Sequence, residues 1–144
     1  MRAPRPDLRA IYRNLFDTLP WPEPIPRPGQ VTFRWGRVEA RRAGACASEA
    51  KIITINGLYQ DERLRNELDQ LMAHEASHFI WPGHSRAFKE FLRRVGVAEP
   101  FRRAQTPPSG IFKAVKAEWL ERSSIAGAFR RRRLTSQIEF PFDD

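Results

Sequence analysis

The sequence predicts an α+β fold in which a small antiparallel-rich sheet packs against a helix bearing a cluster of histidines. Residues 30–38 alternate apolar and polar side chains, and residues 51–56 are rich in isoleucine, so both are typical of short strands. Segments before and after them repeat apolar residues every three or four positions, the period of an amphipathic helix. All three histidines lie between residues 74 and 84, two of them on a long predicted helix and the third just beyond its expected end.

The length and composition indicate one globular domain. The chain has 144 residues, of which 41% are apolar and 29% charged, enough for a single core. No apolar run approaches the roughly 20 residues that span a bilayer. The charged N-terminus is not followed by a hydrophobic region, so we expect no secretory signal and a cytoplasmic protein without a membrane partner. We expect one domain over 1–144, with its core at about 7–97 and a basic helical extension at 98–144.

The net charge of +8 is concentrated on either side of the histidines. Residues 1–60 contribute +5 and residues 101–134 contribute +7, whereas residues 61–100 contribute −1. Basic flanks favour polyanions such as DNA, although the same arginines can form a solvated surface. The densest candidate contact is the run Arg130, Arg131, Arg132 and Arg133.

The N-terminal part is predicted to contain one helix and both strands. Residues 7–19 form an amphipathic helix, and the proline-rich segment 20–29 is an extended connector. After the strand at 30–38, residues 41–47 are small and turn-prone, and the second strand follows at 51–56. Because both strands are short, a meander is the natural pairing, which predicts an antiparallel sheet.

The C-terminal part is predicted to be mainly helical. Asp61 is a suitable N-cap for the long helix, whose apolar stripe packs on the sheet, and Ser85 is a suitable N-cap for the next helix. A proline-containing loop at 98–110 leads into a further helix at 111–122. Residues 138–144 are predicted to be a short extended segment.

The histidines form a motif with the spacing of a metal site. His74 and His78 of H-E-x-x-H lie one helical turn apart, so both can reach one ion. Glu75 is rotated by about 100° from His74, so it can act on a water beside the ion without binding the ion. The proline and glycine at 82–83 are expected to end the helix and bring His84 back as the third ligand. Such histidines can also be half-exposed core residues, but three nitrogen ligands with an open fourth position are typical of catalytic zinc.

These residues predict amide hydrolysis. Zn²⁺ lowers the pKa of water towards ~7 and polarises a carbonyl, while Glu75 takes a proton from water and returns it to the leaving amine. Tyr59 and Arg86 are candidate donors to the oxyanion, although a structural or surface role is commoner for each. Cys46 could cap the zinc, although a small buried cysteine is the commoner case. As the single cysteine, it excludes an internal disulfide and a cysteine-based zinc ribbon.

Beyond the motif, the chain from Leu15 to Val95 resembles the SprT-like metallopeptidases and their YgjP and WLM relatives. Besides the H-E-x-x-H helix, the resemblance rests on L-F-D-T-L-P at 15–20, R-A-G-A-C at 42–46, I-T-I-N at 53–56 and G-H-S-R-A-F at 83–88. It implies a zincin-like fold, a small twisted sheet packed against a metal-bearing helix. It also implies zinc ligands at His74, His78 and His84 and a general base at Glu75. The family includes the Spartan protease core, which acts on proteins crosslinked to DNA.

Some features depart from related patterns. Many SprT-like proteins carry a cysteine-rich zinc ribbon after the core, which one cysteine cannot form. The short insert before the third histidine is closer to the YgjP and WLM pattern. Metzincins share this spacing, but Trp81 stands where they have glycine, and no methionine follows Met72 to form a Met-turn.

The function that the sequence predicts is a zinc-dependent metallopeptidase acting on protein or peptide substrates, including proteins associated with DNA. The alternative is a basic nucleic-acid-binding module with a structural or inactive zincin-like metal site. A scaffold that has lost activity and serves as an interaction protein is a third class, which the complete motif with its third histidine disfavours.

Overall fold

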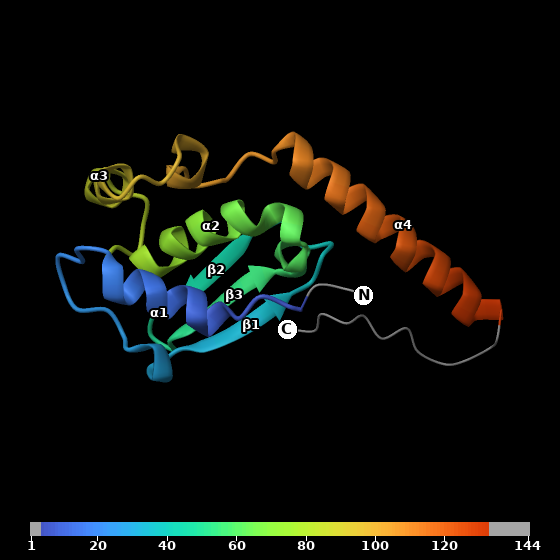
Figure 1. The fold of residues 1–144 in the computed structure, drawn as a ribbon, viewed down its shortest axis with the longest axis horizontal. Coiled ribbons are helices and arrows are strands. Elements are labelled where there is room, and N and C mark those ends of the chain that lie inside the picture. Colours follow the sequence, from blue (N-terminus) through green and yellow to red (C-terminus); the bar gives the residue numbers. More distant parts are fainter. Residues whose placement is uncertain (1–3, 133–144) are drawn as a thin grey trace.

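The computed structural model describes the backbone of residues 4–132 and the side chains of residues 4–122. It has a mixed α+β architecture, as expected, with a small three-stranded sheet and helices packed on it (Figure 1). The strands are β1 (Thr32–Gly36), β2 (Gly44–Ala47) and β3 (Ile52–Asn56). The α-helices are α1 (Leu8–Thr18), α2 (Arg65–Ser77), α3 (Arg86–Arg94) and α4 (Gly110–Arg132). Single 3₁₀ turns are η1 (Pro28–Gln30), η2 (Gly57–Gln60), η3 (Glu62–Leu64) and η4 (Glu99–Arg102).

The strand pairing differs from the predicted antiparallel meander. The strand order is β1-β3-β2, in which β3 runs parallel to β1 and antiparallel to β2. The sheet is therefore mixed, and the predicted antiparallel pairing of the first two strands is wrong. The reason is that residues 41–47, expected to be turn-prone, contain β2. The chain direction reverses between β2 and β3, and β3 then lies between β1 and β2. Glycine and alanine have low strand propensity, so the local pattern did not reveal β2.

Helix α1 forms as the sequence predicts. The Asp7 side chain accepts a hydrogen bond from a backbone N–H of the first turn, which is the N-cap arrangement. The proline-rich connector after α1 crosses the surface and is tied back to the helix. The Tyr12 hydroxyl donates to the Pro26 carbonyl at 2.6 Å, and the Trp21 indole donates to the Leu15 carbonyl at 3.0 Å.

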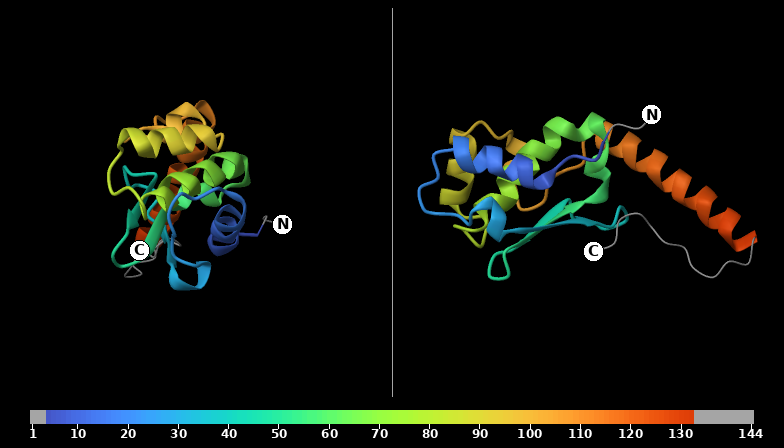
Figure 2. Two further views of the ribbon diagram at one scale, coloured as in Figure 1. Left: turned by 90° about the vertical axis from the view of Figure 1, so that its left-hand side faces the viewer. Right: turned by 60° about the horizontal axis from the view of Figure 1, so that its bottom comes forward.

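The core lies between the sheet and the helices α1 and α2, which Figures 1 and 2 show side by side over one face of the sheet. The parallel register places Phe33 beside Ile53 and Trp35 beside Ile55, so these four side chains share a face. Ile53 and Ile55 are fully buried, and the Tyr12 ring packs edge-on against Phe33. This face is therefore the one that the helices cover.

Helix α2 differs from the prediction at both ends. Asp61 caps η3 rather than α2, accepting a backbone N–H two residues further on at 3.0 Å. At the other end the helix stops at Ser77, with His78 as its C-cap, instead of at Pro82. The N–H groups of residues 78–80 donate to carbonyls three residues earlier, the pattern of a tighter 3₁₀ turn. The α-helix therefore ends before Pro82.

Helix α3 follows the histidine segment and begins as expected. The Ser85 hydroxyl accepts the Phe88 N–H at 3.3 Å, the predicted N-cap. The helix ends at Arg94, and Gly96 follows with a φ of 85°, the left-handed conformation common after a helix. The loop predicted at 98–110 contains η4, which packs against α2 and α3.

Helix α4 is longer than predicted, and its first turns dock on η2 and η3. Val115 is fully buried there, and the Phe112 ring lies 5.7 Å from that of Tyr59. An ion pair between Arg63 and Glu118, 2.6 Å long, closes the edge of this contact. Beyond it, α4 extends away from the rest of the structure (Figure 1).

Two predictions fall beyond the described part of the chain. Arg133 and the segment 138–144 lie outside the described residues, as do the side chains of Arg130 to Arg132. DNA contact through this run therefore stays a prediction. Within the described residues, no helix has both the length and the apolar character needed to cross a membrane.

Candidate metal centre

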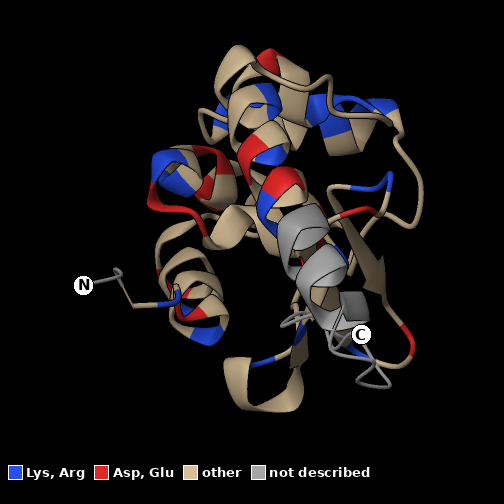
Figure 3. Cartoon of the chain, turned by 90° about the vertical axis from the view of Figure 1, so that its right-hand side faces the viewer, with Lys and Arg blue, Asp and Glu red and all other residues tan. Residues whose placement is uncertain are grey.

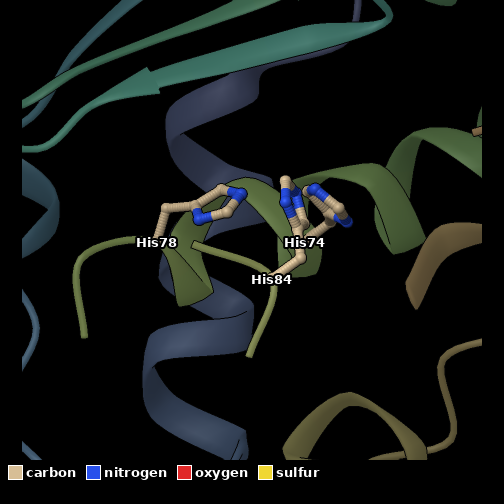
Figure 4. Close-up of side chains that lie close together, drawn as sticks. All are labelled: His74, His78 and His84. Carbon is tan, nitrogen blue, oxygen red and sulfur yellow. The ribbon is translucent and has the colours of Figure 1, made fainter. Parts of the chain in front are cut away.

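The three histidines come together at the end of α2. His74 projects from the helix and His78 from its C-cap, while His84 approaches from the segment before α3 (Figure 4). Each offers one ring nitrogen to a group whose members all lie within 4.8 Å of one another. The structure thus unites the ligands that the sequence predicts, and the turn of residues 78–81 allows the return of His84.

Two of the imidazoles are held by backbone carbonyls. The Nδ1 of His74 lies 2.6 Å from the carbonyl oxygen of Phe101, and the Nδ1 of His78 lies 2.9 Å from that of Trp81. A carbonyl can only accept, so each Nδ1 carries a proton, and in the neutral form of each ring the Nε2 has the free lone pair. Such a hydrogen bond to the outer nitrogen sets the tautomer and the ring orientation of metal-binding histidines.

Phe88 forms an apolar wall for the whole cluster. Its ring centroid lies 5.0 Å from that of His74, 4.7 Å from that of His78 and 5.2 Å from that of His84. The side chain is fully buried, so it restricts the rotation of all three imidazoles and excludes water from one side. Helix α3 therefore contributes both the anchor of His84 and the wall of the site.

The surroundings favour neutral imidazoles. Burial lowers the pKa of His74 to about 4, with further lowering by His78 and His84 and a partial offset by the bond to the Phe101 carbonyl. Burial, His78 and Lys89 also lower the pKa of His84. His74 and His84 thus offer the unprotonated nitrogens that a metal ion needs.

The donor set fits zinc. Imidazole nitrogens are ordinary zinc ligands, and tetrahedral bonds of 2.0–2.1 Å place two nitrogens about 3.4 Å apart. The three nitrogens lie within 4.8 Å of one another, so all three can reach one ion after at most a small movement of the rings. His84 can make such a movement because it lies on a partly exposed segment outside any helix. Among the described residues, this group offers three nitrogen ligands.

Glu75 occupies a different position from its histidine neighbours. Its side chain is only 4% exposed and points towards β2, where its Oε2 would lie 3.0 Å from a Cβ placed on Gly44. Burial raises the pKa of this carboxyl to about 8, and Arg42 opposes that shift. Among the described residues, none donates a hydrogen bond to the carboxylate. It is therefore a buried acid whose polar partner has to come from a water or a ligand.

The alternative candidates lie elsewhere. Tyr59 is 2% exposed, and its ring packs against Phe112 of α4, which favours the structural role for this tyrosine. Arg86 is exposed on the first turn of α3. Cys46 lies on the inner face of β2, and the group among the described residues that could hold a metal ion consists of the three histidines without it.

We expect the Cys46 thiol to be unreactive in the native protein. Burial and the nearby Glu75 raise its pKa to about 12, so the thiolate that reacts with alkylating agents is scarce at pH 8. Alkylation by iodoacetamide should be at least about a hundredfold slower than in the urea-unfolded chain, where the pKa is ~8.5. Because this is the single cysteine, mass spectrometry reports its rate directly. Native and unfolded rates within tenfold of each other would contradict the expectation.

Sequence reasoning missed three contributors to the site. The Phe101 carbonyl lies 27 residues from His74, so no local spacing could link them. Phe88 and Gly44 lie within stretches that carry the family resemblance, but neither was assigned a role at the site. No protein-family model matches the chain, and no curated protein or solved structure matches it either.

Proposed function

We propose that this protein is a zinc-dependent metallopeptidase of SprT-like type with a zincin-like fold. The observation that carries the proposal is the pairing of three converging imidazoles with a buried carboxylate that has no protein hydrogen-bond donor. A structural zinc site is normally closed by four protein ligands, whereas three ligands leave room for a substrate. The packing of the sheet against the helix that carries H-E-x-x-H also supports the zincin-like assignment.

His74, His78 and His84 would hold the ion. When bound, zinc supplies a Lewis acid that lowers the pKa of water and polarises a peptide carbonyl. The carbonyls of Phe101 and Trp81 keep two of these rings in the tautomer that binds metal. Phe88 keeps one side of the centre dry, which strengthens electrostatic interactions within it.

Glu75 would move the proton. Its carboxylate accepts a proton from the attacking water, and the carboxylic acid then gives that proton to the nitrogen of the leaving amine. A group with a pKa near neutrality both takes and returns a proton efficiently, and burial shifts Glu75 in that direction. A cation beside it lowers that pKa, which favours the basic form at the start of the reaction.

The charge of the chain bears on the substrate class. A net charge of +8 favours a polyanion as a second partner, so proteins associated with DNA are the first substrates to test. Six arginines on the described surface form ion pairs, however, and Figure 3 shows basic and acidic positions interspersed along the helices. The alternative function, a nucleic-acid-binding module with a structural or inactive metal site, leaves the buried Glu75 unexplained.

Metal analysis joined to a proteolysis assay tests the proposal. The purified protein should contain about one zinc per chain and cleave denatured casein, alone or with DNA present. A chelator should stop cleavage, and added zinc should restore it. Salt-dependent DNA binding without cleavage of free or DNA-bound protein would support the alternative and overturn the peptidase.

A further inference from the structure

We propose that Gly44 is a positioning residue for Glu75, because its missing side chain leaves the space in which the Glu75 carboxylate sits. The catalytic part of this inference rests on the proposed peptidase function. The packing part does not, because it concerns the contact between β2 and α2. Enzyme kinetics test the catalytic part, and thermal stability tests the packing part.

The sheet register places Gly44 towards α2. Gly44 pairs with Ile55 in the antiparallel register, and Ile55 is fully buried on the face that the helices cover. A Cβ at position 44 would lie 3.0 Å from Oε2 and 3.3 Å from Cδ of Glu75, and 3.1 Å from the carbonyl oxygen of Thr54. These distances are tighter than ordinary van der Waals contact, so an added methyl group has to displace the carboxylate.

Backbone conformation does not explain the glycine. Among the described residues, the glycine with positive φ is Gly96, so the backbone at Gly44 is open to any L-residue. The space beside Glu75 is what restricts this position. The described residues donate no hydrogen bond to the carboxylate, so its orientation depends on the packing around it. The backbone of β2 at Gly44 is part of that packing.

Asn56 fixes the position of the chain that leads into β2. Its side-chain amide donates to the carbonyls of Ala40 and Arg42 at 3.2 and 3.3 Å, and its backbone N–H donates to the Ala43 carbonyl at 2.8 Å. Asn56 is itself 3% exposed. The chain leading into β2 is thus tied to β3 immediately before Gly44, so β2 cannot easily retreat from an added side chain.

The first measurement compares Gly44→Ala with Gly29→Ala, which serves as a matched control because a Cβ at Gly29 meets nothing within 4 Å. Gly44→Ala should lower kcat by about 10- to 100-fold, since small displacements of a catalytic group are costly, while KM and zinc content stay near those of the wild type. Gly29→Ala should leave all three unchanged. An unchanged kcat in Gly44→Ala overturns the positioning role.

The second measurement needs no activity. Gly44→Ala should lower the Tm by about 3–6 °C in the otherwise wild-type chain, and by less than half as much beside Glu75→Ala, where the carboxylate is gone. The contact with the Thr54 carbonyl accounts for the remaining loss. Equal shifts in both backgrounds overturn the packing contact. The Tm shift of Gly44→Ala could be smaller beside Glu75→Ala in a protein that has no peptidase activity. That result overturns the proposed function and the positioning role but supports the packing contact.

Discussion

Replacing Glu75 with glutamine should abolish peptide hydrolysis while the histidines keep their zinc. The change removes the group that accepts the proton of water but preserves the size of the side chain beside Gly44. General-base catalysis contributes about 10²- to 10⁴-fold, so we expect kcat/KM to fall by that factor or below detection. Zinc content measured by mass spectrometry should equal that of the wild type, since Glu75 is not part of the metal-binding group.

The matched control is Asp69→Asn on the same helix. Asp69 is half-exposed, and its carboxylate forms a surface ion pair with Arg65 at 3.4 Å, so the substitution removes the same charge from α2 far from any buried contact. It should leave kcat/KM within about twofold, because surface pairs contribute little. Equal cleavage by wild type and Glu75→Gln would remove Glu75 from the mechanism.

Replacing His84 with alanine should release the metal and leave the fold intact. His84 is the third nitrogen of the cluster but lies outside α2 and α3, and the cap of α3 belongs to Ser85. Losing a partner of a ligand already weakens metal affinity by 10- to 100-fold, so losing a ligand itself should weaken zinc binding by more than about 100-fold. Competition with a chromophoric chelator measures this affinity, and circular dichroism of the zinc-free proteins checks the fold.

Gly83→Ala is the control for this variant. It changes the neighbouring position of the same segment, where a Cβ meets nothing within 4 Å. Its zinc affinity should match that of the wild type. Tight zinc binding by His84→Ala would show that His84 is not a ligand, and a wild-type protein that binds no zinc would remove the metal centre altogether.

Local patterns were sufficient for the α-helices, for two of the three strands and for the candidate metal-binding histidines. The spacing of His74 and His78 is a property of one helical turn, so it can be read from the sequence without the fold. The cap at Ser85 also formed as predicted, because an N-cap depends on residues within three positions. These predictions succeeded because the interactions that decide them join residues close together in the sequence.

The sequence by itself therefore determined the helices, two of the three strands and the identity of the three histidines that converge. The tertiary structure decided the parallel pairing of β1 with β3, the bond from His74 to the Phe101 carbonyl and the contact of Gly44 with Glu75. Each of these contacts joins residues at least 20 positions apart. In each, at least one residue takes part through its backbone or, at Gly44, through the absence of a side chain. Such contacts leave no periodicity or motif in the sequence, so only packing of the whole chain could reveal them.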